Sequence, residues 1–110
     1  MRLLPLFALC NTAAFTLQAQ ADNEKLIECS AYYQILSVAG DQADLSRPQA
    51  SRAFYQLLEK AGDNAQNQEA VAQQMVVLAK EIPGRISEAN LKPFRQKHDS
   101  ECHALLNTPT

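Results

Sequence analysis

Cysteine is the residue type whose spacing says most about chemistry in this 110-residue chain. Cys10 lies in an apolar N-terminal run, whereas Cys29 and Cys102 lie near opposite ends of the rest of the chain. The sequence has no CxxC motif, so it shows no local redox or zinc motif. Two cysteines in an exported protein usually form a disulfide bond, and we predict one between Cys29 and Cys102. The competing interpretation is a redox or metal-binding pair.

Both histidines, His98 and His103, lie near the C-terminus. His98 falls on the apolar face of a predicted helix, so we expect a half-buried core histidine held by one hydrogen bond. The functional alternative is a ligand, or a group that titrates near neutral pH. Asp99 and His103 are spaced i, i+4 and could form a surface contact or a weak two-ligand metal site. With so few ligands together, we predict no bound metal and no cofactor.

Three tyrosines are candidate interface or pocket residues. Tyr32 and Tyr33 are consecutive, so on a helix they point about 100° apart, with Tyr33 on the same stripe as Cys29 and Tyr32 on its flank. Tyr55 lies just off the apolar stripe of a later helix. We expect all three to pack between helices with their hydroxyl groups at the rim. The alternative is that Tyr32 and Tyr55 anchor a protein interface, where tyrosine is enriched.

The sequence lacks the short motifs that assemble a catalytic centre. It has no GxSxG nucleophile elbow, no HExxH zinc motif, no glycine-rich phosphate loop and no calcium loop. Catalytic triads can form from residues far apart in sequence, but no set of nucleophile, base and orienting group stands out. We therefore predict a non-enzymatic protein.

The first 21 residues have the layout of a cleaved secretory signal peptide. Arg2 precedes an apolar run over residues 3–17, and residues 19–21 (Ala-Gln-Ala) form the small-x-small pattern of a cleavage site. A membrane anchor would need about 20 mostly apolar residues, and this run is shorter. We predict cleavage after Ala21, loss of Cys10 with the signal, and a periplasmic or secreted bacterial protein without a stable membrane anchor.

Residues 22–110 form one predicted domain with helical periodicity throughout and no alternating strand pattern. Capping residues, prolines and glycines divide it into four helices, followed by a frayed tail at residues 107–110. The first helix is expected from about Asn23 to Ala39, with a cap at Asp22 or Asn23, and the second lies between a cap at Ser46 and a stop at Gly62. The third is expected from about Asn67 to Ile82. The last is expected from Leu91 to about Leu106, with a cap at Asn90.

These elements predict an all-α fold, a small four-helix up-down bundle, because short connections favour antiparallel neighbours. The first and last helices then run antiparallel, which brings Cys29 near the start of one to Cys102 near the end of the other. The first helix is apolar around most of its circumference, so it is either buried centrally or uses its second face for a partner.

The same arrangement predicts the surroundings of His98. Tyr33 or its neighbour Tyr32 should lie beside the ring and could offer a hydroxyl group as a hydrogen-bond partner. Glu28 is expected to point away, and burial without a carboxylate should keep the ring neutral.

The charge pattern gives no sign of a nucleic-acid partner. The formal net charge is −2 and becomes −3 when Arg2 leaves with the signal. The stretch from Lys80 to Lys97 is locally basic, either as a solvated face or as a patch for an acidic partner.

The surplus apolar face of the first helix predicts a binding, inhibitor or accessory module that acts on another envelope protein. The alternative is a small-ligand or metal-binding periplasmic stress protein with a pocket near His98.

Overall fold

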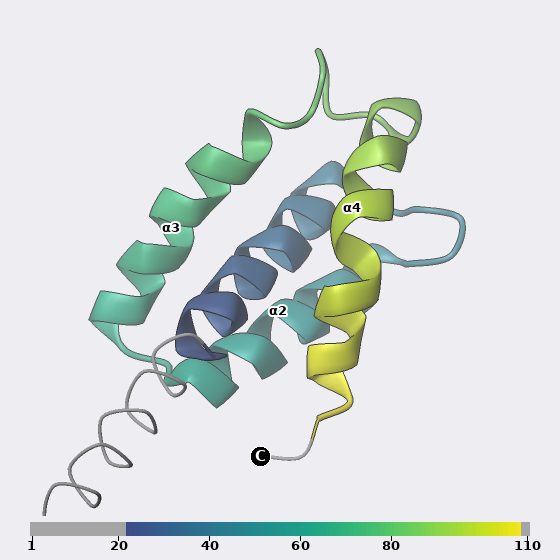
Figure 1. Cartoon of the computed structure of the whole chain (residues 1–110). Helices are drawn as coiled ribbons and strands as arrows, with labels where there is room; N and C mark the ends of the chain where they lie inside the picture. The colour runs from purple at the N-terminus through teal and green to yellow at the C-terminus, as the bar shows by residue number, and fades with distance from the viewer. Residues whose placement is uncertain (1–21, 109–110) are drawn as a thin grey trace, which may run out of the picture.

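The computed structural model describes residues 22–108, and this part of the chain contains four α-helices and no strand (Figure 1). The predicted signal peptide, with Cys10, and residues 109–110 lie outside it. The all-α prediction is confirmed. The helices are the N-terminal helix (residues 22–39), α2 (Arg47–Ala61), α3 (Ala65–Ala79) and α4 (Glu88–Leu106).

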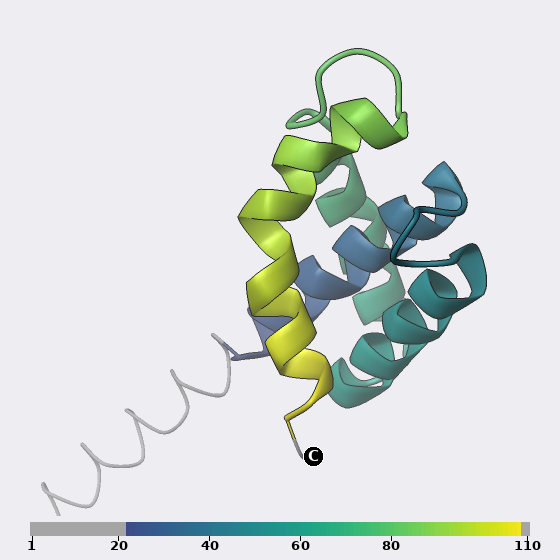
Figure 2. The ribbon, with the colours of Figure 1, turned by 90° about the vertical axis from the view of Figure 1, so that its right-hand side faces the viewer.

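The helices form the predicted bundle, with the N-terminal helix running through its middle (Figures 1 and 2). Figure 1 shows α3 on one side of this helix and α4 on the other, with α2 packed below. The disulfide between Cys29 and Cys102 joins the first part of the N-terminal helix to the last part of α4, so these helices are antiparallel as predicted. Within residues 22–108, no helix combines the length and apolar character needed to span a membrane.

Helix α2 begins and ends as its sequence predicts. The Ser46 hydroxyl accepts a hydrogen bond from the Gln49 backbone N–H at 3.3 Å, and the Gln49 side chain accepts one from the Ser46 N–H at 2.8 Å. This reciprocal capping box satisfies two of the N–H groups that a helix start leaves without partners. Pro48 fits in the first turn, and Gly62, with a φ of 111°, ends the helix.

The predicted bounds of the N-terminal helix and α3 need correction. Residue 22 is already helical, so the caps predicted at Asp22 and Asn23 are wrong. Helix α3 is capped by Asn64, whose side chain accepts from the Asn67 N–H at 2.8 Å, and it ends at Ala79, before the predicted Ile82. Ile82 is nevertheless buried, so the apolar pattern that extended the prediction reflects packing beyond the helix end.

The predicted cap of α4 is also wrong. The cap is Ser87, whose hydroxyl accepts from the Asn90 N–H at 3.3 Å, while the Asn90 side chain donates to the Arg85 carbonyl at 2.8 Å. The helix therefore starts at Glu88, and Pro93 lies beyond its first turn. Proline has no N–H, so the Ala89 carbonyl lacks its usual partner within the helix.

The core surrounds the N-terminal helix on most sides. This central burial was one of the two predicted outcomes, and it means that the other helices cover the apolar face that seemed surplus in the sequence. Ser30 on this helix is fully buried, and its hydroxyl has no hydrogen-bond partner within the described residues. The buried residues of this helix are Ile27, Cys29, Ser30, Ala31, Tyr32, Tyr33, Ile35 and Leu36.

Candidate functional site

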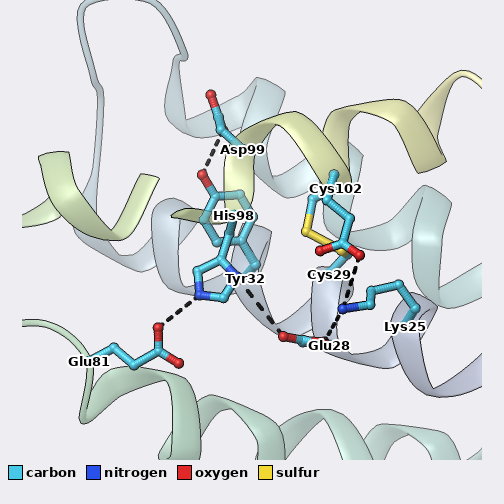
Figure 3. The surroundings of a disulfide bond; sticks show 9 residues. Lys25, Glu28, Cys29, Tyr32, Glu81, His98, Asp99 and Cys102 are labelled. Carbon is cyan, nitrogen blue, oxygen red and sulfur yellow. Dashed lines mark hydrogen bonds and ion pairs between the residues drawn. A yellow bond between two sulfur atoms is a disulfide. The ribbon is translucent and has the colours of Figure 1, made fainter. Parts of the chain in front are cut away.

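The Cys29–Cys102 disulfide lies at one end of a buried aromatic layer between the N-terminal helix and α4 (Figure 3). Its two Cα atoms are 5.2 Å apart, and both cysteines are buried. The Tyr32 ring centroid lies 5.6 Å from that of His98 and 5.3 Å from that of Phe94. The prediction that Tyr33 or Tyr32 lies beside His98 is confirmed, with Tyr32 as the neighbour.

The Tyr32 hydroxyl was expected at the rim of the core or bonded to His98, and both expectations are wrong. It donates a 2.6 Å hydrogen bond to Asp99 Oδ1, and Tyr32 has no exposed surface. Burial, followed by the contact with Asp99, raises the pKa of this phenol well above its ordinary value. Burial also raises the pKa of Tyr33 to about 12. Tyr32 therefore belongs to the core and presents no side chain to a partner.

Arg95 extends the polar contact outward from Asp99 to the 40–46 loop. Its guanidinium binds both oxygens of Asp44, at 2.6 and 3.0 Å, and Asp99 Oδ2 at 3.2 Å. The Asp44 hydrogen bond raises the pKa of Arg95 and holds the pKa of the Asp44 carboxyl below its usual value. Bidentate arginine–carboxylate pairs fix geometry as well as charge. A continuous chain of hydrogen bonds thus joins a core tyrosine to a surface loop.

His98 contacts two carboxylates, which corrects the expectation that it would lie without any. Glu81 Oε1 is 2.9 Å from Nε2, and Glu28 Oε1 is 4.0 Å from Nδ1, on opposite edges of the ring (Figure 3). The expectation that Glu28 would point away is therefore wrong. The expectation that His98 would be half-buried is also wrong, because this residue is 5% exposed. Lys97 and Lys25 in turn pair with Glu81 and Glu28, at 3.1 and 2.9 Å. One hydrogen bond, to Glu81, holds the ring as predicted.

The contact with His98 has a consequence for Glu81 in acid. Partial burial opposes ionisation of this carboxyl, but the hydrogen bonds from His98 and Lys97 outweigh it and hold the pKa below its ordinary value. A carboxyl with a lowered folded pKa stabilises the fold above its unfolded pKa, and this contribution is lost as pH falls through the folded pKa.

Replacing Glu81 with Gln should therefore flatten the loss of stability in acid. We expect the wild-type chain to lose up to about 1 kcal/mol more than Glu81→Gln between pH 5 and pH 3, a small effect because Glu81 is partly exposed. Urea unfolding at stepped pH measures it, and Glu59→Gln, at an exposed position on α2, is the control. Equal acid slopes for wild type and Glu81→Gln would contradict the prediction.

Two open hollows lie on the surface beside this network. One, which we call the loop–α4 hollow, has a volume of about 680 Å³ and lies between the 40–46 loop and the outer side of α4. The other, of about 580 Å³, lies between the N-terminal helix and α3. Neither lining includes His98. The loop–α4 hollow is lined by Gln42, Asp44, Glu88, Lys92, Arg95, Gln96, Asp99, Ser100 and His103.

One of the two candidate metal ligands is already engaged by other side chains. Asp99 and His103 both line the loop–α4 hollow, but Asp99 is bound to Tyr32 and Arg95. Within residues 22–108, no group of three or more His, Cys, Asp or Glu side chains could hold a metal ion. The cysteines form the predicted disulfide, so neither presents a free thiolate to a metal ion.

Tyr55 is the predicted interface candidate that the structure leaves accessible. It is 59% exposed on α2, with its ring centroid 4.7 Å from that of Phe54. The valines at 76 and 77 on α3 are also exposed, by 61% and 53%, although their residue type alone indicates no function. Their adjacent positions on a helix with few charges were the signal that could have identified them.

Comparison with protein-family models, with curated proteins and with solved structures finds no match to this chain.

Proposed function

We propose that the chain is an exported, non-enzymatic binding module that acts on another envelope protein through the loop–α4 hollow. The observation that carries this proposal is the Arg95 side chain, which ties the 40–46 loop to α4 through Asp44 and Asp99. A loop that is fixed before binding loses less conformational entropy when a partner docks.

The chemistry of the hollow suits a polypeptide surface. Its lining carries both signs of charge, with Lys92 and Arg95 facing the same space as Asp44 and Glu88. Mixed charges in a fixed arrangement give specificity for a partner with the complementary pattern. An open hollow of about 680 Å³ suits exposed side chains of a protein better than an enclosed small molecule.

Export supports the choice of an envelope partner. The Cys29–Cys102 bond requires an oxidising compartment to form and persist, and the N-terminal 21 residues have the pattern of a secretory signal. We propose a periplasmic or secreted location on these two grounds. The alternative, a small-ligand or metal site near His98, is not favoured because neither hollow is lined by His98, and the described residues hold no group of three metal-ligating side chains.

A charge reversal inside the hollow tests the proposal. Lys92→Glu changes an exposed lining residue, so we expect it to abolish capture of a specific envelope protein by the immobilised mature chain. Arg85→Glu is the matched control, because it makes the same charge change at an exposed position in the 80–87 connector. Quantitative mass spectrometry of material captured from envelope extract provides the measurement.

The result would support the hollow if a captured protein is lost with Lys92→Glu and retained with Arg85→Glu. Equal capture by all three chains would place the contact elsewhere. If no protein is enriched by the wild-type chain over a blank matrix, the binding-module proposal fails.

A further inference from the structure

Helix α3 presents a charge-poor face at the outside of the bundle (Figure 1). Glu69 is its only charged residue, although each of the other helices carries several. Val76 and Val77 are 61% and 53% exposed on this helix. Depletion of charge together with exposed apolar side chains is characteristic of the centre of a protein interface.

Four exposed residues of this region form one straight stripe. Glu69, Gln73, Val76 and Lys80 follow one another at spacings of four, three and four residues, which places them on the same side of a helix. Lys80 is the C-cap residue and keeps helical backbone angles (φ −67°, ψ −17°), so it continues the stripe. The stripe thus has an acidic end, a neutral middle and a basic end.

This order of charges is complementary to itself. When two copies of the stripe lie antiparallel about a two-fold axis, Glu69 of one copy faces Lys80 of the other, and Gln73 faces Val76. A two-fold contact repeats each pair, so the arrangement forms two opposite-charge pairs and no like-charge pair. Within residues 22–108, neither Glu69 nor Lys80 forms an ion pair inside its own chain, and the Glu69 carboxylate accepts a long hydrogen bond of 3.5 Å from the Gln73 side chain.

We propose that the outer stripe of α3 is a homodimer interface, with a second copy of this chain as its occupant. The spacing of the stripe matches that of helices packed at a crossing angle of about 20°. A contact between two single helices is small compared with a stable protein interface, so the dimer should be weak and concentration-dependent. The neutral middle offers no charge to attract a different partner, whereas the charged ends suit a second copy in antiparallel orientation.

A charge swap tests this pairing in the mature chain. Sedimentation equilibrium from about 10 μM to about 1 mM at low ionic strength should show a monomer–dimer equilibrium. Glu69→Lys or Lys80→Glu alone replaces both opposite-charge pairs with like-charge pairs, and should weaken dimerisation about tenfold. The double variant, Glu69→Lys with Lys80→Glu, restores both pairs in reverse and should return the dimerisation constant to within about threefold of wild type.

A second variant tests the middle of the stripe. Val76→Asp places two carboxylates near the two-fold axis and should abolish the dimer, whereas Val38→Asp, at a valine 57% exposed on the N-terminal helix, should leave it intact. Far-UV circular dichroism checks that each variant keeps its helices. A wild-type chain that stays monomeric up to about 1 mM overturns the proposal. Association that is insensitive to the α3 variants, or that the double swap does not restore, also overturns it.

Discussion

Replacing both Cys29 and Cys102 with Ala should lower the free energy of unfolding by about 4 kcal/mol. The bond joins residues 73 apart in sequence, so it removes many open conformations from the unfolded chain. Both cysteines are fully or almost fully buried, so the variant also loses apolar contacts. Small domains with limited cores depend heavily on such links. Urea unfolding of the mature chain, followed by circular dichroism, measures the difference.

Thiol chemistry provides the control for this result. The mature chain, unfolded without reductant, should show almost no free thiol, whereas reduction should release two thiols per chain. The reduced wild-type chain should then lose nearly the same stability as the double variant. A loss below about 1 kcal/mol, or two reactive thiols before reduction, would contradict a stabilising disulfide.

The helices and their order could be predicted because they depend on local signals and on one covalent constraint. Ser46, Pro48 and Gly62 define α2 almost without ambiguity, since a capping hydroxyl, a first-turn proline and a terminal glycine agree. The placement of Cys29 early and Cys102 late then indicated that the first and last helices are antiparallel. The disulfide and the helix pattern gave this topology independently.

The start of α4 was missed because two polar residues compete for the same role. Ser87 and Asn90 are both good caps, and the apolar stripe begins only at Leu91, which favoured the later site. The structure uses both, with Ser87 as the cap and the Asn90 side chain bonded to the Arg85 carbonyl. Helical periodicity does not distinguish such neighbours, because the first turn contributes little to the core.

The polar network was beyond prediction for a different reason. Asp44 and Glu81 lie in connecting segments, and their approach to Arg95 and His98 depends on loop paths that no residue periodicity specifies. The i, i+4 spacing in sequence links Asp99 only to His103, its neighbour on the same helix. The bond from Tyr32 to Asp99 spans 67 residues of sequence and follows from the packing of two helices. Long-range polar pairs of this kind are set by tertiary structure.

The chain should lose stability steeply above pH 10 because of its two buried tyrosines. The folded pKa of Tyr33 is raised to about 12, and that of Tyr32 is raised further by burial and by Asp99. A group with a raised folded pKa stabilises the fold fully below its unfolded pKa, and loses this contribution as pH rises toward the folded value. Each tyrosine should therefore cost about 1.4 kcal/mol per pH unit above pH 10.

Replacing Tyr32 with Phe separates the two effects of its hydroxyl group. At pH 7 the variant loses a hydrogen bond to a charged acceptor, so we expect it to be about 2 kcal/mol less stable than wild type. Above pH 10 its stability should fall about half as steeply, because Tyr33 alone remains to titrate in the core. Urea unfolding at pH 7, 10, 10.5, 11 and 11.5 gives both quantities, and wild type and variant should converge as pH rises.

Tyr55→Phe is the matched control, because this tyrosine is 59% exposed on α2 and makes the same chemical change outside the core. It should keep the wild-type slope above pH 10. Lys25 also has a raised pKa, through its hydrogen bond to Glu28, but its contribution is common to all three chains and cancels in the comparison. If Tyr32→Phe keeps the full alkaline slope, the phenol is not held protonated by the fold, and the bond to Asp99 does not have the role assigned to it.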